Sequence, residues 1–265
     1  PLYSSAASDV YKRQLYELRK AKGMTEEQAL NIVTTNNMFY ACVALKRGDV
    51  DGVVGGAVFS SADVSRAAFQ VIKAAPGISS VSSCFVMVPP EDFKYKKYPA
   101  YIFSDCAVIP YPTSDQLADI VVAAADSAKK ICEMDPKIAM LSFSSKGSAN
   151  HESVEKVRVA YQKVKEEHPD IDVDGELQLD ASLVDSVANQ KAPGSPVAGK
   201  ANVLVFPNLD AGNIGYKIAQ RFGNCMAIGP IMQGLALPVN DLSRGCVAED
   251  IAAVAAITAL QSVKG

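Results

Sequence analysis

A hydroxyl, a guanidinium and a carboxylate lie close together near the C-terminal end of the sequence. Ser243 and Arg244 belong to the segment 238–245, PVNDLSRG, and Asp250 follows at the predicted start of an alanine-rich helix. Backbone N–H groups at a helix start and an arginine side chain both attract anions, so this segment could bind an anionic ligand. A second interpretation stays open, in which Asp250 only caps the helix and Arg244 pairs with Asp241 on the surface.

The helix predicted after this segment has apolar residues at helical spacing. They are Ile251, Val254, Ala255, Ile257 and Leu260. Residues spaced in this way lie on one side of a helix, so we expect this side to be buried.

A second polar segment follows the predicted strand 138–143. Ser144, Ser145, Lys146, Gly147 and Ser148 offer hydroxyls, one cation and a flexible backbone that could surround a phosphate group. The segment lacks the Gly-x-x-x-x-Gly-Lys spacing of a Walker A loop, and a serine-rich turn can equally be a solvated loop. Phosphate binding and a plain surface turn both remain open here.

Two more strand-end segments carry polar side chains. Asn208, Asp210 and Asn213 follow the predicted strand 202–206, where Asp210 could cap the next helix and the amides could meet a ligand. Arg66 lies in the first turn of the helix expected after the strand 52–57. Because a cation there opposes the helix dipole, we expect an anion or a carboxylate to accompany it.

The elements that must position these segments alternate between strands and helices. The expected strands are 52–57, 81–88, 101–109, 138–143, 176–179, 202–206 and 226–228, and the expected helices are 15–22, 37–47, 62–73, 114–132, 151–167, 181–189 and 211–222. A capping box at Thr25 opens one more helix. This alternation predicts an α/β protein with a largely parallel sheet, in which ligands bind beyond the carboxyl ends of the strands.

Composition excludes several classes of function. The 265 residues are long enough for two modest domains, and a net charge of −3 without a basic stripe argues against a nucleic-acid partner. The six cysteines are scattered and there are only two histidines, so we expect no metal site and reduced thiols in a cytoplasmic protein. No apolar run approaches the ~20 residues needed to cross a bilayer, so we expect no membrane partner.

Residues 1–14 show no convincing periodicity, and we interpret them as non-native.

Four of these segments together resemble the phosphate acetyltransferase (phosphotransacetylase) family. They are GGA with ADVSR at 55–66, MLSFSSKGSA at 140–149, FPNLDAGNIGYK at 206–217, and PVNDLSRG at 238–245. The resemblance extends from about Leu15 to the C-terminus, and the family's opening strand–helix unit is missing. It implies two three-layer α/β/α domains with a cleft between them, as in isocitrate and isopropylmalate dehydrogenases. Domain I would comprise residues 1–76, N-terminally truncated, with 233–265, and domain II residues 77–232.

The resemblance also implies an activity and roles for individual residues. The family transfers an acetyl group reversibly between coenzyme A and orthophosphate, as a homodimer and with coenzyme A as a substrate rather than a tightly bound cofactor. By position, Asp250 matches the proposed general base, and Ser243 and Arg244 match groups that stabilise the oxyanion. Arg66 matches a phosphoryl-binding arginine, and Arg19 a position implicated in coenzyme A binding.

The remaining expected substrate-binding residues are those of the two strand-end loops, namely Ser144, Ser145, Gly147, Ser148, Asn208, Asp210 and Asn213. No covalent acyl-enzyme is required, so we expect Cys84, Cys106 and Cys246 to take no part in the chemistry.

Two alternatives stay open within the same family. A phosphate butyryltransferase performs the same chemistry on a longer acyl chain, although the motif Asn-Asp-Leu-Ser-Arg-Gly favours the acetyl enzyme. A non-catalytic domain that senses acetyl-coenzyme A is the second. Loss of Asp250 or Arg244 would favour it, and both residues are present.

Overall fold

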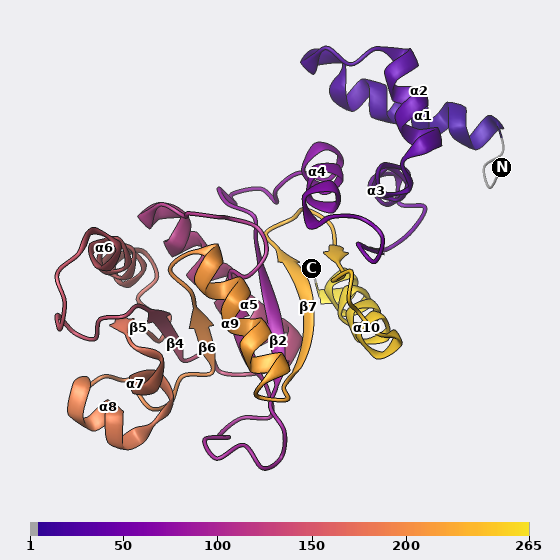
Figure 1. Ribbon diagram of the computed structural model, residues 1–265. Coiled ribbons are helices and arrows are strands. Elements are labelled where there is room, and N and C mark those ends of the chain that lie inside the picture. The colour runs from indigo at the N-terminus through magenta and orange to yellow at the C-terminus, as the bar shows by residue number, and fades with distance from the viewer. Residues whose placement is uncertain (1–4, 265) are drawn as a thin grey trace. The chain divides into compact units, whose positions relative to one another are not determined.

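The computed structural model describes residues 5–264 and divides the chain into two compact units. The first unit contains residues 1–77 and 235–265, and the second contains residues 78–234. The segment 78–234 is therefore inserted into a unit built from both ends of the chain (Figure 1). None of the helices formed by the described residues is long and apolar enough to span a membrane.

The first unit is mainly helical around a short parallel strand pair. β1 and β8 pair with Val53 opposite Val239 and Gly55 opposite Asp241. Its elements are α1 (Ser5–Arg19), the 3-10 helix η1 (Lys20–Lys22), α2 (Glu26–Thr35), α3 (Asn37–Arg47), β1 (Val53–Gly55), α4 (Ser61–Val71), β8 (Val239–Asp241) and α10 (Ala248–Lys264).

Local sequence signals explain where these helices begin and end. Thr25 and Gln28 form the expected capping box at the start of α2, with each side chain accepting from the other residue's backbone N–H. Gly48 ends α3 in the left-handed conformation, with φ of +81°. The segment without convincing periodicity is helical from Ser5 onward, because α1 runs without interruption into the predicted helix. That residues 1–14 are non-native stays a prediction.

The second unit is built on a six-stranded sheet in the order β5-β4-β6-β3-β2-β7. Its elements are β2 (Ser82–Val88), β3 (Tyr101–Ser104), α5 (Ser114–Cys132), β4 (Ile138–Leu141), α6 (Glu152–Glu167), β5 (Val173–Leu177), α7 (Leu179–Leu183), α8 (Asp185–Lys191), β6 (Val203–Val205), α9 (Leu209–Arg221) and β7 (Met226–Gln233). The pairs β4–β5, β4–β6 and β3–β6 are parallel, whereas β2 is antiparallel to both of its neighbours. The sheet is therefore largely parallel, with β2 as the reversed strand.

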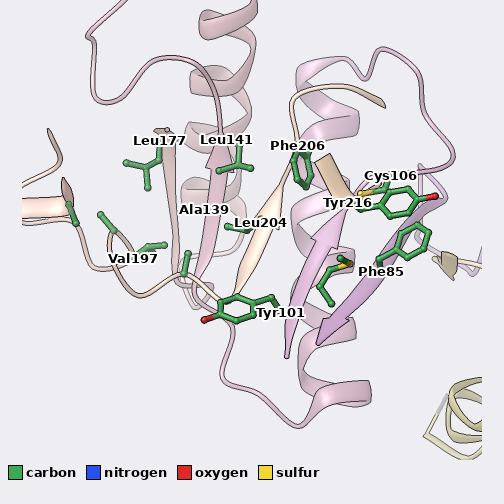
Figure 2. Packing of buried hydrophobic residues seen from close by; sticks show 14 of the residues in the cluster. Phe85, Tyr101, Cys106, Ala139, Leu141, Leu177, Val197, Leu204, Phe206 and Tyr216 are labelled. Atoms are coloured by element: carbon green, nitrogen blue, oxygen red, sulfur yellow. The ribbon is translucent and has the colours of Figure 1, made fainter. Parts of the chain in front are cut away.

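Helices cover both faces of this sheet. α5 and α6 pack on one face and α9 on the other (Figure 1). On the α9 face, Phe85 and Tyr216 stack with ring centroids 4.0 Å apart, in a cluster that continues through Leu204 and Leu141 to Leu177 (Figure 2). Because side chains alternate along a strand, the residues between these positions face α5 and α6. The unit is thus the expected three-layer α/β/α arrangement.

Several element boundaries differ from those expected from the sequence. The expected strand 101–109 ends at Ser104, because buried Asp105 accepts hydrogen bonds from the N–H groups of Ala107, Val108 and Ile109 and folds the chain into a loop. The expected helix 181–189 is two short helices, α7 and α8. The strand expected at 226–228 continues to Gln233, the strand expected at 176–179 is Val173–Leu177, and β8 was not expected.

Candidate active site

β8 carries the loop with Ser243 and Arg244 to the carboxyl edge of the strand pair. Asn240 anchors β8 to α10 from the side, since its amide donates to Thr258 at 2.8 Å and to Gln261 at 2.7 Å. Ser243 and Arg244 are both exposed, and the Ser243 hydroxyl accepts from the N–H of Gly245. Arg244 forms no ion pair with any residue that the structure describes, so the surface pair with Asp241 is not present. Its guanidinium is available to a ligand.

Asp250 is half-buried in the first turn of α10. Its Oδ2 accepts a hydrogen bond of 3.0 Å from the N–H of Val247, which is a helix-capping contact. A capping role and a role as base are compatible, because the other carboxylate oxygen stays free to accept a proton. The general base assignment therefore stays a prediction.

The buried side of α10 matches the expected one only in part. Val254 is fully buried and Ile257 and Leu260 are half-buried, but Ile251 is 42% exposed and Ala255 is also exposed. Thr258 is buried instead, because its hydroxyl bonds to the Val254 carbonyl and to Asn240 of β8. A buried polar residue therefore belongs to the inner side of this helix, which hydropathy alone does not predict.

Asp241, the last residue of β8, is the unexpected acid of this region. It is 1% exposed, and neither carboxylate oxygen forms a hydrogen bond of normal geometry with a described residue. Burial raises its pKa from 3.8 to about 6, although the Ser61 hydroxyl and the Leu242 amide act in the opposite direction. Gly56 covers the group closely: a Cβ there would lie 2.0 Å from Oδ1, and its φ of +112° suits only glycine.

Arg66 lies on α4, in the second turn rather than the first. Its guanidinium donates to Asp63 at 2.8 Å, and the arginine side chain is 57% exposed. The carboxylate partner expected for a cation at this position is thus Asp63, which Ser60 also holds through a 2.6 Å hydrogen bond. An exposed ion pair is weak, so Arg66 can exchange Asp63 for a phosphoryl group.

Arg19 is the last residue of α1 and is half-buried. Its Nε is buried and has no hydrogen-bond partner among the described residues. An unsatisfied buried donor on an arginine is unusual, and a ligand oxygen would satisfy it.

In the second unit, the loop after β4 encloses a carboxylate of the protein itself. Ser144 donates to Oε1 of Glu176 at 2.8 Å, the Gly147 N–H donates to the same atom at 2.9 Å, and Arg158 donates to Oε2 at 3.0 Å. Burial alone would raise the pKa of Glu176, but these donors outweigh it and lower the pKa to about 2. The loop therefore surrounds the Glu176 carboxylate, and its expected role toward phosphate stays a prediction.

The other two serines of this loop form hydrogen bonds within the protein. Ser145 is buried, and its hydroxyl donates to the Gln178 side-chain oxygen and accepts from the Gln178 N–H. Ser148 is exposed, and its hydroxyl accepts from the Ser145 N–H. Of the four residues expected to bind substrate here, Gly147 and Ser148 are exposed. Ser144 and Ser145 are buried, so they could meet a ligand only after rearrangement.

The loop after β6 is held by its amides. Asn208, rather than Asp210, caps α9 by accepting from the Ala211 N–H, and Asn213 donates to the Cys106 carbonyl. Asp210 is exposed and accepts from the Tyr111 hydroxyl at 2.8 Å. These contacts fix the start of α9, and the roles of all three residues toward substrate remain predictions.

Three buried thiols are poorly suited to nucleophilic attack. Burial raises the pKa of Cys42 to about 12 and also raises those of Cys84 and Cys106, whereas Cys246 is only half-buried and its expected lack of a role stays a prediction. Among the described residues, no group of three or more His, Cys, Asp or Glu side chains could hold a metal ion.

Comparison with solved structures identifies the class of fold. The phosphotransacetylase from Streptococcus pyogenes superposes with a TM-score of 0.90 at 48% sequence identity, over 99% of this chain and 77% of that one. The two α/β units are therefore those of a phosphotransacetylase-like fold.

Sequence comparison then gives the family. The model of the family described as phosphate acetyl/butaryl transferase matches residues 3–259. The phosphate acetyltransferase of Clostridium acetobutylicum is 53% identical over 262 residues, covering 99% of this chain and 78% of that protein. That of Thermoanaerobacterium thermosaccharolyticum is 52% identical, covering 96% of this chain and 77% of the relative. The chain belongs to the phosphate acetyl/butaryl transferase family and is an acyltransferase. The similarity also begins well before Leu15, where the motifs alone led us to expect it.

Proposed function

We propose that this chain catalyses the reversible transfer of an acetyl group between coenzyme A and orthophosphate. The observation that carries the proposal is the 53% identity to a phosphate acetyltransferase over 99% of the chain. The exposed, unpaired Arg244 and the weakly paired Arg66 support it, because both can receive a phosphate or an oxyanion.

In the proposed acetyl transfer, each candidate side chain of the first unit has its own role. In the direction of thioester synthesis, the thiol of coenzyme A gives its proton to Asp250, and the thiolate attacks the carbonyl carbon of acetyl phosphate. Arg244 and Ser243 stabilise the oxyanion that forms, and Arg66 holds the phosphoryl group, which leaves as orthophosphate. Arg19 offers its free Nε–H to coenzyme A. No covalent intermediate with the protein is needed, in keeping with the buried thiols.

Arsenate-dependent loss of acetyl-coenzyme A is the decisive assay. Arsenate replaces phosphate as acyl acceptor, and the acyl arsenate hydrolyses, so loss of the thioester absorbance reports transfer directly. Turnover with acetyl-coenzyme A well above that with butyryl-coenzyme A is expected. The reverse preference would favour the butyryl reaction, and binding without turnover would favour an acetyl-coenzyme A sensor.

We also propose that the chain forms a homodimer through α9. Ile214, Ile218 and Phe222 follow one side of this helix and are 57%, 53% and 90% exposed. Asp210 lies near its start and Arg221 at its end, so two antiparallel copies of α9 would place opposite charges beside the apolar stripe. Ile218→Asp should give a monomer in sedimentation equilibrium. Val159→Asp, on the similarly exposed Val159 of α6, is the matched control.

We propose a cytoplasmic location because the cysteine thiols are free. All six cysteines are free, and three of them are buried in the reduced form. A reducing compartment fits this state.

A further inference from the structure

The buried carboxyl group of Asp241 has no hydrogen bond of normal geometry with any residue that the structure describes. A buried polar group without a hydrogen bond is uncommon and costs stability, so it calls for an explanation. Its position at the end of β8 is fixed by the pairing with Gly55 and by close contact with Gly56. Among the described residues, the Ser61 hydroxyl and the Leu242 N–H are the polar groups that lower its pKa.

Ser61 connects this buried group to the protein surface. It is the first residue of α4 and is exposed, whereas Asp241 is buried. The first turn of a helix leaves backbone N–H groups without intrahelical acceptors, and the positive end of the dipole adds to their pull on anions. Ser60 satisfies one of these groups, the Asp63 N–H, at 3.2 Å.

The charged groups on the neighbouring elements are few. On α4 they are Asp63 and Arg66, which pair with each other, and on the loop after β8 there is Arg244. β1 contributes Gly55, and α10 contacts β8 through the neutral side chains of Thr258 and Gln261. Arginine stays charged throughout the neutral range. Of the carboxylates on these elements, Asp63 has its pKa lowered, mainly by the Ser60 hydroxyl, and Glu249 and Asp250 lie at the start of α10, so Asp241 is the one whose pKa burial raises.

We propose that Asp241 is a positioning residue for an oxyanion site at the start of α4. Its neutral carboxyl group donates a hydrogen bond to the Ser61 hydroxyl, and Ser61 donates one to a tetrahedral dianion. The dianion is of the phosphate class, and only this choice of anion rests on the proposed function. The hydroxyl oxygen of Ser61 can accept one hydrogen bond while its proton points to the ligand. An ionised Asp241 would instead take the Ser61 proton and turn the oxygen lone pairs toward the anion, which repels it.

The arrangement makes anion binding depend on a proton. No bond is formed or broken: the proton stays on Asp241, and only the direction of the two hydrogen bonds decides whether Ser61 donates outward. Binding of a dianion must in turn favour the protonated acid, because the two equilibria are linked. Anion affinity should therefore fall as pH rises through the titration of Asp241.

Inorganic sulfate is the appropriate probe, because it stays a dianion across this pH range whereas phosphate itself titrates. With an acid that titrates at about 6, the sulfate Kd of the unmodified protein should rise about tenfold per pH unit above pH 6.5, measured by isothermal calorimetry. Asp241→Asn should bind sulfate with a Kd that is constant from pH 5.5 to 8, because an amide N–H donates at every pH. Ser61→Ala should weaken binding about tenfold at pH 5.5.

The matched control is Asp51→Asn, which removes an exposed carboxylate of the same unit and should keep the slope of the unmodified protein. A pH-independent sulfate Kd in the unmodified protein, an unchanged slope in Asp241→Asn, or full affinity in Ser61→Ala would each overturn the proposal. Arsenolysis is measured in parallel, so absence of turnover with a normal sulfate slope would count against the proposed function alone.

Discussion

Replacing Asp241 by asparagine should stabilise the first unit at neutral pH. The carboxyl group is 1% exposed and lacks a normal hydrogen bond, so its ionised form is held in an unfavourable environment. Asparagine has almost the same shape and no charge to desolvate. The substitution therefore removes a cost that the folded protein carries and the unfolded chain does not.

The size of this effect follows from the pKa of Asp241. The pKa is 3.8 in the unfolded chain and is raised to about 6 in the folded chain. The folded state therefore loses stability as pH rises above 3.8, and the full loss is reached above pH 6, where the folded group is ionised as well. Two pKa units at 1.36 kcal/mol each give a cost of about 3 kcal/mol at pH 7.5, where the folded group is ionised. At pH 4.5 the cost falls to about 1 kcal/mol, and below pH 3.8 it disappears.

Urea unfolding at pH 4.5 and 7.5 tests this prediction. Hydrogen exchange on peptides from α3 and α10 follows the first unit separately from the second, which matters because the two units need not unfold together. Asp241→Asn should raise the free energy of unfolding by about 3 kcal/mol at pH 7.5 and by about 1 kcal/mol at pH 4.5, with Asp51→Asn as the neutral control. A destabilised variant at pH 7.5, or a gain that does not change with pH, would refute the argument from desolvation.

Three further predictions concern the site and the second unit. Asp250→Asn should lower turnover in arsenolysis about 100-fold while leaving coenzyme A affinity largely intact, and near-normal turnover would remove Asp250 as the base. Arg244→Lys and Arg66→Lys should each lower kcat/KM about tenfold, because an ammonium cannot replace a planar fork; two fully active variants would exclude bidentate recognition. Glu176→Gln should destabilise the second unit by about 3 kcal/mol at pH 7, since Arg158 loses its buried partner. Because the pKa of Glu176 is lowered to about 2, this difference should disappear as urea unfolding is repeated at pH values falling from 4.5 toward 2, and a constant difference would contradict it.

Periodic signals in the sequence predicted the helices well. On α5 the apolar residues at helical spacing, Leu117, Ile120, Val121, Ala124 and Ala128, are buried throughout. On α4 the same holds for Val64, Ala67, Ala68 and Val71, and for Ile72 directly after the helix. A helix repeats every 3.6 residues, so the buried face can be read locally, without knowing what packs against it.

Contacts between distant residues could not be predicted in this way. The sequence left phosphate binding and a plain turn open for the serine-rich loop, and the carboxylate that this loop surrounds, Glu176, lies 29 residues beyond Gly147 in the sequence. Nothing local distinguishes a loop that awaits phosphate from one already filled by a carboxylate. The three-residue strand β8 could not be predicted from local sequence either, because it forms by pairing with β1, which is far away in the sequence.

The two buried acids, Glu176 and Asp241, illustrate how the structure separates stability from function. Glu176 is surrounded by four donated hydrogen bonds, from Ser144, Gly147 and two from Arg158, and its pKa is lowered. Asp241 is buried to a similar depth without any, and its pKa is raised. A satisfied carboxylate binds its own loop tightly and leaves little capacity for a ligand. An unsatisfied one destabilises the resting state, so a group that completes its hydrogen bonds relieves that cost. By this reasoning the proposed anion site at the start of α4 has capacity left for a ligand, whereas substrate binding by the exposed Gly147 and Ser148 of the loop after β4 stays a prediction.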